Sequence, residues 1–297
     1  MGIDGIINVN KPEGRTSFNV VAQLRRLASE KHVGHAGTLD PIATGVLPVC
    51  FGQATRIIQF LADRPKTYQA QIELGITTDT FDRQGKIVER NDPNHITKIQ
   101  VYEALEAFRG VVSQVPPAFS ALKQEGRRYY ELARAGIPVI PKPRRVEITK
   151  LEIVRYQLPI VDIKVACSKG TYIRSLAYDI GRHLGCGAYL KNLVRLQCGP
   201  FSIEDALSMD ELQDRFQNNT WHTALLPVDS PLWNWKAMIV DSQKEMDIKN
   251  GRPLPASETA QISGEYCRAY DLNGNFLAIL RFVPGKQLWH PEKVFSL

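Results

Sequence analysis

Residues 34–47 have the sequence GHAGTLDPIATGVL, in which three glycines and one proline surround a single carboxylate, Asp40. Glycine permits positive φ without a Cβ penalty and proline fixes φ at about −65°, so Gly34, Gly37 and Pro41 predict a tightly specified loop. An Asp-Pro pair in such a loop is usually a turn with a capping side chain. A catalytic carboxylate is the alternative, and the rest of the sequence has to distinguish the two.

The composition is that of a globular protein. The chain has 297 residues, of which 43% are hydrophobic, enough for one large domain and a small second one. No run approaches the roughly 18 apolar residues of a membrane span. The N-terminal residues mix acids, bases and proline where a signal peptide needs a continuous apolar stretch. These features predict a cytoplasmic protein without membrane contact.

The cysteines and histidines argue against a disulfide framework and a metal site. Cysteine occurs five times and never with C-x-x-C spacing, so buried reduced thiols are expected. His32 and His35 would lie one turn apart in a helix, but the neighbouring glycines disfavour a helix there, and no second ligand pair follows at metal spacing. We therefore expect no metal.

Most of the positive charge lies in one segment. The net charge is +6, and between residues 123 and 145 seven bases meet two acids, a local excess of five. Those bases are Lys123, Arg127, Arg128, Arg134, Lys142, Arg144 and Arg145. Because Tyr129 and Tyr130 lie among them, the segment is suited to neutralising phosphates and stacking on the bases of single-stranded or looped RNA. A solvated helix face followed by a proline-rich loop is the alternative.

Hydrophobic periodicity predicts strands and helices in the first half of the chain. Residues 5–9 (GIINV) predict a strand, and the capping residue Thr16 predicts a helix start. In that helix the residues at helical spacing are Phe18, Val21, Leu24 and Leu27. From Tyr68 to Leu74 every second residue is apolar, which predicts a half-buried strand. The turn residues that follow, before IVER at 87–90, predict a hairpin.

The second half continues this mixture. Thr97 caps a predicted helix that Gly110 stops, residues 146–157 and 160–168 predict two strands, and a further helix from Ile173 is ended by Gly185. Without a repeating βαβ period, these elements favour an α+β fold with a largely antiparallel sheet. Beyond the prolines and tryptophans of residues 221–237, short strand-like runs predict a small β-rich module that docks on the main domain.

A second glycine-bearing stretch, residues 167–196, places Tyr172 and Arg174 where a strand meets a helix. Alternate residues of an extended segment share one face, so both side chains are expected in the same cleft. An arginine beside a carboxylate keeps the carboxylate ionised, which an aspartate acting as nucleophile or base needs. An ordinary surface pair is the alternative for Arg174.

Four motifs in order resemble those of the TruB family of tRNA pseudouridine synthases. Residues 34–47 are similar to the family's catalytic motif, 10–17 (NKPEGRTS) to its lysine-proline motif, 66–85 (KTYQAQIELGITTDTFDRQG) to its tyrosine motif, and 167–181 (CSKGTYIRSLAYDIG) with 193–196 (LVRL) to its arginine and leucine motifs. Together they cover most of the first 200 residues. The resemblance favours a catalytic Asp40 over a simple turn.

The resemblance implies a fold and a reaction. The fold is the pseudouridine synthase fold, a mixed and largely antiparallel sheet flanked by helices, with a catalytic domain over residues 1–230 and a PUA-like RNA-binding domain over residues 237–297. The reaction converts the T-loop uridine of tRNA (position 55) to pseudouridine by base flipping, cleavage at N1, rotation of uracil and rejoining through C5. This isomerisation is redox-neutral, so no cofactor is expected. A monomer without an obligate protein partner is expected.

The resemblance also implies roles for individual residues. Asp40 would be the essential aspartate, Tyr68 would stack on the target uracil, and Arg174 would pair with Asp40. Tyr172 and Leu193 would complete the pocket wall.

Further residues would hold the RNA. Lys11 would support the N-terminal loop, with a surface lysine as the alternative, and His35 would fill the space left by the flipped nucleotide, with a backbone hydrogen bond as the alternative. Residues 115–145 occupy the position of the family's RNA-gripping insertion. Its candidate contacts are Lys123, Arg127, Arg128, Arg144 and Arg145.

Two other functions compete with this interpretation. In a glycosidase or nucleosidase, Asp79 or Asp82 would form a carboxylate pair with Asp40, although turn formation accounts for both acids. A hydrolase releases free uracil, whereas an isomerase retains it. A non-catalytic RNA-binding protein would share the basic segment but would have no need of Asp40 and Arg174 together.

Overall fold

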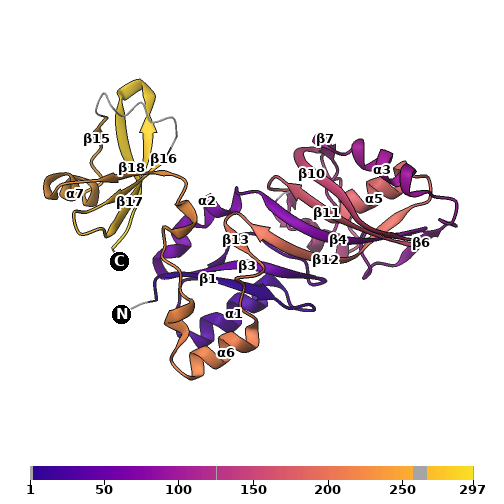
Figure 1. Cartoon of the computed structure of the whole chain (residues 1–297), viewed down its shortest axis with the longest axis horizontal. Helices are drawn as coiled ribbons and strands as arrows, with labels where there is room; N and C mark the ends of the chain where they lie inside the picture. The colour runs from indigo at the N-terminus through magenta and orange to yellow at the C-terminus, as the bar shows by residue number, and fades with distance from the viewer. Residues whose placement is uncertain (1–2, 125, 257–265, 297) are drawn as a thin grey trace.

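A nine-stranded mixed sheet forms most of the molecule (Figure 1). The computed structural model describes residues 3–124, 126–256 and 266–296. The strand order is β1-β3-β12-β4-β11-β10-β7, with β2 paired to β3 and β13 to β12. These strands are β1 (Gly5–Lys11), β2 (Val33–His35), β3 (Ala43–Phe51), β4 (Lys66–Leu74), β7 (Gly110–Gln114), β10 (Arg144–Gln157), β11 (Ile160–Cys167), β12 (Ala188–Cys198) and β13 (Phe201–Ser202). Among the described strands of this sheet, only β3 and β12 pair in parallel, which confirms the predicted largely antiparallel α+β fold.

Helices cover both ends of this sheet. Figure 1 shows α3 and α5 beside β4, β10 and β11, and α1 and α6 beside β1 and β3. The α-helices are α1 (Ser17–Leu27), α2 (Ile58–Ala62), α3 (Lys98–Glu106), α4 (Tyr129–Arg134), α5 (Ile173–His183), α6 (Met209–Gln217) and α7 (Ser242–Lys249), and the short 3-10 helices are η1 (Gly52–Ile57), η2 (Trp221–Ala224), η3 (Ser230–Leu232) and η4 (Pro284–Lys286). Thr16 and Thr97 cap α1 and α3 as predicted, through side-chain oxygens that accept backbone N–H groups.

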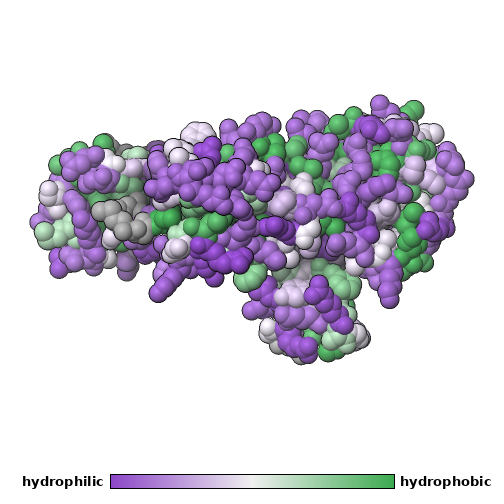
Figure 2. Space-filling view, turned by 90° about the horizontal axis from the view of Figure 1, so that it is seen from below, coloured by the Kyte–Doolittle hydropathy of each residue, from purple (hydrophilic) through white to green (hydrophobic). Residues whose placement is uncertain are grey.

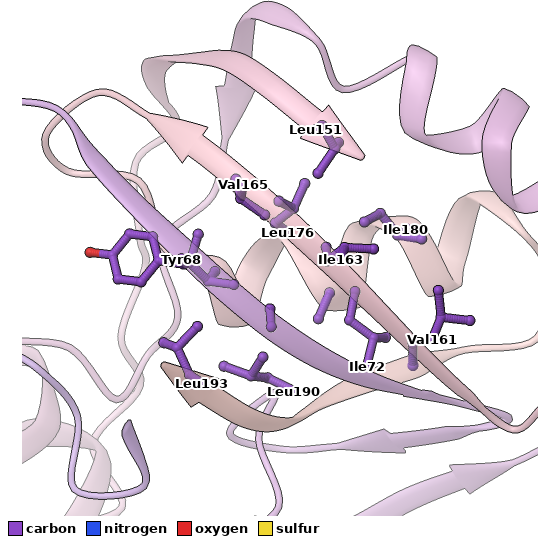
Figure 3. Close-up of a cluster of buried hydrophobic side chains, with 14 of the residues drawn as sticks. Tyr68, Ile72, Leu151, Val161, Ile163, Val165, Leu176, Ile180, Leu190 and Leu193 are labelled. Atoms are coloured by element: carbon purple, nitrogen blue, oxygen red, sulfur yellow. The ribbon is translucent and has the colours of Figure 1, made fainter. Parts of the chain in front are cut away.

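The burial of β4 explains why this strand is central. Tyr68, Ala70, Ile72 and Leu74 are buried and the residues between them are not, which confirms the alternation seen in the sequence. Their side chains join those of α5 in one hydrophobic cluster (Figure 3). Strand β1, in contrast, is buried on both faces: Ile7 packs in the cluster with α1 and α6, and Ile6 packs in a different cluster.

Two local predictions were wrong in part. IVER forms β6 (Ile87–Arg90), whose hairpin partner is β5 (Ile76–Thr78) in a separate two-stranded sheet, because Gly75, with φ of 88°, ends β4 first. On α1, Phe18 is 70% exposed. The predicted Val21 and Leu24 are buried together with Val20, so the inner face of the helix is rotated away from Phe18.

The predicted β-rich module is a five-stranded sheet at the C-terminal end, in the order β14-β16-β17-β18-β15. Its strands are β14 (Lys236–Ile239), β15 (Leu254–Pro255), β16 (Tyr266–Tyr270), β17 (Phe276–Val283) and β18 (Leu288–Val294). Phe276, Ile279 and Phe295 share a hydrophobic cluster with Ile6 and Val46 of the large sheet, so the module docks on the main body as expected.

One face of the molecule is mostly polar (Figure 2). Figure 2 shows one face on which hydrophilic residues predominate and hydrophobic ones form small groups. Among the described residues, no helix combines the length and the apolar character needed to cross a membrane. All five cysteines are buried as free thiols, as predicted.

The basic segment combines a hairpin with a short helix, α4, which a proline-containing loop follows. It contains a short hairpin, β8 (Lys123–Gln124) with β9 (Arg127–Arg128), followed by α4 and by the start of β10. Tyr129 is only 6% exposed, so its ring is packed inside and is not available for stacking on RNA. Tyr130 is half-buried, with the Arg134 guanidinium over its ring.

Candidate active site

A cavity of about 270 Å³ lies at the middle of the large sheet, where the loop before β3 meets β4, β12 and the start of α5. It brings together five residues that the sequence predicted for one site. These are Asp40, Tyr68, Tyr172, Arg174 and Leu193. Because they come from segments up to 153 residues apart, from Asp40 to Leu193, the folded sheet and not local sequence assembles the site.

Asp40 and Arg174 form an ion pair at this cavity. Arg174 Nε lies 2.9 Å from Asp40 Oδ2, and Nη2 donates to Oδ1 at 3.2 Å. The Arg174 side chain is 5% exposed and that of Asp40 is 36% exposed, so the guanidinium is fixed in the protein while the carboxylate faces the cavity. One hydrogen bond and a second close contact between the charged groups together fix the orientation of the carboxylate.

A second carboxylate, Asp82, completes the network around Arg174. Its Oδ2 accepts from Arg174 Nη1 at 3.4 Å, and its side chain is 7% exposed. Sequence reasoning assigned Asp79 and Asp82 to a turn. Both acids do form turn contacts, because Asp79 accepts the backbone N–H of Lys86 and Asp82 accepts the backbone N–H of Gln84. The sequence did not predict that Asp82 also contacts the Arg174 guanidinium.

Burial changes the acidity of Asp40. Desolvation raises the pKa of Asp40 above the usual aspartate value, the Arg174 charge opposes this, and the Asp82 charge raises the pKa further. The expectation that Arg174 simply holds Asp40 ionised was therefore incomplete. Arg174 limits a rise that burial and the second carboxylate impose, and it leaves a carboxylate more basic than a free aspartate.

Tyr68 and Leu193 form an apolar wall of the cavity. Figure 3 shows the Tyr68 ring beside Leu193 at the end of the hydrophobic cluster, with its hydroxyl oxygen directed away from Ile72 and Leu190. Burial raises the pKa of Tyr68 to about 12, so the ring keeps its hydroxyl proton at neutral pH. A neutral, rigid ring of this kind is suited to stacking on a nucleobase.

Tyr172 is positioned by its backbone. Its N–H donates to Gln114 Oε1 at 2.8 Å, and its carbonyl accepts from Gln114 Nε2 at 3.0 Å. Gln114 ends β7 and is 3% exposed, so the edge strand of the sheet fixes the residue that precedes α5. Desolvation raises the pKa of Tyr172.

Lys11 is buried, which excludes the surface lysine considered as its alternative. Its ammonium donates to the carbonyls of Pro12 at 2.8 Å and Arg15 at 2.6 Å and so ties the N-terminal loop together. Desolvation lowers the pKa of Lys11 to about 8, although the Asp40 charge opposes this. The N–H of Gly14 donates to the Pro41 carbonyl at 2.8 Å, which joins this loop to the one that contains Asp40.

His35 lies on β2 and is not among the residues that line the cavity. Its Nδ1 is buried without a hydrogen-bond partner among the described residues, so the backbone hydrogen bond considered as its alternative is absent at that atom. Burial, followed by the Arg195 charge, lowers the pKa of His35.

Two further cations line the cavity and were not predicted. Lys66 begins β4 and is 7% exposed, and Arg195 lies on β12 and is 1% exposed. Both lie inside motifs quoted from the sequence, KTYQ and LVRL. Both could have been predicted from strand geometry: alternate residues of a strand share a face, which places Lys66 beside Tyr68 and Arg195 beside Leu193.

The basic candidates lie outside the cavity, on the surface. Lys123, Arg127, Arg128, Arg144 and Arg145 are all exposed. Strand pairing brings Lys123 opposite Arg128, and Arg144 and Arg145 pair with β7, so the five bases belong to two neighbouring stretches of backbone. Within the described part of the chain, their side chains form no ion pair.

The fold is shared with solved structures. It matches the Cbf5 chain of a Cbf5-Nop10-Gar1 complex with a TM-score of 0.76 and 24% identity, over 98% of this chain and 85% of that one. It matches a chain of an H/ACA RNP bound to a substrate RNA containing 2'-deoxyuridine with a TM-score of 0.75 and 22% identity, over 99% and 85%. At these identities the likeness shows the fold alone.

Sequence relatives define the family. A model described as TruB family pseudouridylate synthase (N terminal domain) matches residues 25–173, and one for the tRNA pseudouridylate synthase B C-terminal domain matches residues 174–232. A tRNA pseudouridine synthase B of Dehalococcoides mccartyi is 41% identical over 99% of this chain and 97% of its own length, and one of Clostridium kluyveri is 44% identical over 93% and 95%. The chain belongs to the TruB family of tRNA pseudouridine synthases, and its reaction is the isomerisation of uridine to pseudouridine in tRNA. This confirms the predicted enzyme class over the hydrolase and the non-catalytic binder.

Proposed function

We propose that this enzyme isomerises the T-loop uridine of tRNA at position 55, as a cytoplasmic monomer that needs no cofactor. The observation that supports the proposal most directly is the Asp40–Arg174 ion pair at a cavity walled by Tyr68 and Leu193. A base inside a folded T loop has to leave its stack to reach such a cavity, at a cost of roughly a few kcal/mol. Stacking on Tyr68 offsets part of that cost.

Asp40 starts the reaction in its ionised form. It either attacks the anomeric carbon or removes a ribose proton, and both routes need a carboxylate held toward the sugar. The contact with Arg174 supplies that orientation, and the raised pKa of Asp40 makes the carboxylate a better base than a free aspartate. Uracil then rotates against Tyr68 and rejoins the ribose through C5.

Other residues hold the RNA around this step. Tyr172 completes the cavity wall, His35 fills the space that the flipped nucleotide leaves, and Lys11 keeps the N-terminal loop in place. The exposed bases between 123 and 145 neutralise phosphates of the T arm. Residues 1–230 act as the catalytic domain, and the PUA-like residues 237–297 contact a further part of the tRNA.

The test is conversion of an unmodified T-arm transcript in the presence of a chelator, followed by pseudouridine mapping. Asp40→Asn keeps the size of the side chain but removes the nucleophile and base. We expect it to bind the RNA within about tenfold of the parent, a change of roughly 1.4 kcal/mol or less, and to release no tritium from C5-labelled uridine. Tritium release by Asp40→Asn would remove Asp40 from catalysis. Free uracil would indicate a hydrolase.

A further inference from the structure

The cavity contains more positive than negative charge. Lys66 and Arg195 line it together with Arg174, whereas its described carboxylates, Asp40 and the adjoining Asp82, both already contact Arg174. Neither Lys66 nor Arg195 forms an ion pair with a carboxylate among the described residues. Fully buried cations are normally paired, so two unpaired ones beside the same cavity need an explanation.

The hydrogen bonds of these two cations do not neutralise them. Lys66 Nζ donates to the carbonyls of Ala62 and Arg64, each at 2.6 Å. Arg195 Nε donates to the Val46 carbonyl at 2.6 Å, and Nη2 donates to the Gly37 carbonyl at 3.0 Å. These carbonyls orient the two side chains but have no formal charge, so the excess positive charge remains available to a molecule in the cavity.

The strand register places this charge behind Tyr68. Arg195 is the direct cross-strand partner of Tyr68 in the β12–β4 pairing, and Lys66 lies two residues before Tyr68 on the same face of β4. A base stacked on the Tyr68 ring therefore lies over a wall from which two cations approach, and Arg174 lies beside Asp40 at the sugar. Burial lowers the pKa of Lys66, the Arg195 charge lowers it further, and the more distant Asp63 charge opposes this without forming an ion pair with Lys66.

We propose that Lys66 and Arg195 stabilise the negative charge that develops on uracil when its bond to ribose breaks; this inference rests on the proposed function. When N1–C1′ breaks, the electron pair stays with uracil, whose anion is delocalised over N1 and the two carbonyl oxygens. When C5 bonds to C1′, N1 takes up a proton and C5 loses one, so charge is conserved. Preorganised cations in a water-poor site favour the charged intermediate over neutral uridine.

The test compares uridine with 5-fluorouridine at the target position of the same T-arm RNA. Fluorine makes the departing base more acidic, so its anion needs less stabilisation by the protein. In the full chain, Lys66→Met and Arg195→Met are expected to slow single-turnover cleavage of the uridine N-glycosidic bond by about 100-fold or more. With 5-fluorouridine the loss relative to the parent is expected to be within about tenfold.

Charge-conserving and remote variants provide the controls. Lys66→Arg and Arg195→Lys are expected to retain the uridine rate within about tenfold. Lys164→Met removes an exposed lysine from β11, on the face of the sheet opposite Tyr68, and is expected to match the parent. Lys66→Met alone decides the question if Arg195→Met does not fold, as judged by its thermal melt.

Four outcomes separate the possibilities. Equal losses on the two bases, or full activity of Lys66→Met, would overturn the role proposed for these cations. A loss confined to RNA affinity would also overturn it and would make them binding residues. If the parent itself does not convert the T-arm uridine, the proposed function fails first, whatever the variants do.

Discussion

Replacing Arg174 by methionine tests how much this shared cation contributes to the free energy of unfolding. The substitution keeps an unbranched side chain but leaves Asp40 and Asp82 without their shared cation. The Asp82 side of the network dominates the cost, because its side chain is 7% exposed, whereas water screens the 36% exposed Asp40. Leaving a buried charge unpaired costs about 3–5 kcal/mol, so we expect Arg174→Met to lose that much free energy of unfolding at about pH 8.

The loss should depend on pH in a defined direction. Without Arg174, burial and the Asp82 charge raise the pKa of Asp40 in the folded state further above the value of about 3.9 that an aspartate has when unfolded. The folded variant then binds protons more tightly than the unfolded chain. Its loss of unfolding free energy relative to the parent is therefore largest above the raised pKa and becomes smaller as pH falls toward about 4.

Urea unfolding of parent and variant between about pH 8 and pH 5 measures both effects. Adding Asp82→Asn to Arg174→Met should recover at least half of the loss, since one unpaired charge is removed. Lys150→Met is the matched control: it breaks an exposed 3.1 Å pair with Glu152 and should cost less than about 1 kcal/mol. A loss below about 1 kcal/mol for Arg174→Met, or one that does not change with pH, would refute the reasoning.

Two further predictions concern RNA binding and Lys11. Replacing four exposed arginines by alanine should lower the slope of log affinity against log salt by about 3, since each lost phosphate contact removes about 0.7 to 0.9, and an unchanged slope would make the segment a solvated surface. The four are Arg127, Arg128, Arg144 and Arg145. Because the pKa of Lys11 is lowered to about 8 while an unfolded lysine has about 10.4, the unfolded chain binds the proton more tightly between these values. As pH rises from about 8 to 10, the free energy of unfolding of the parent should therefore increase by up to about 3 kcal/mol relative to that of Lys11→Met. A difference between the two proteins that stays constant over this pH range would contradict the prediction.

Local patterns in the sequence were sufficient for the elements of the fold. The alternation from Tyr68 to Leu74 and the caps at Thr16 and Thr97 depend on residues within a few positions of one another, and all were found as predicted. Phe18 was placed on the wrong face of α1, because helical spacing shows which residues share a face but not which face points toward the core. The IVER hairpin forms, but with β5 as its first strand, because Gly75 ends β4 one residue after Leu74.

The charges of the site were harder to predict. The pairing of Asp40 with Arg174 followed from motif resemblance. The contact of Asp82 with Arg174 joins residues 92 positions apart, so a pattern of neighbouring residues could not predict it. Tyr129 resembled a stacking ring because it stands among bases, yet its place at the start of a short helix turned it inward. Burial of a charged or polar side chain is a property of the assembled sheet.

The assembled sheet also explains why so much backbone control surrounds one acid. Gly45, with φ of 101°, pairs with Arg195 across the parallel β3–β12 ladder, and a Cβ there would lie 2.3 Å from the Arg195 carbonyl oxygen. Gly37, with φ of 98°, supplies the carbonyl that accepts from Arg195 Nη2. The glycines on either side of Asp40 thus allow β12 to approach closely enough for its buried cation to reach the cavity that Asp40 faces. The conformation of this loop therefore positions Arg195 as well as Asp40.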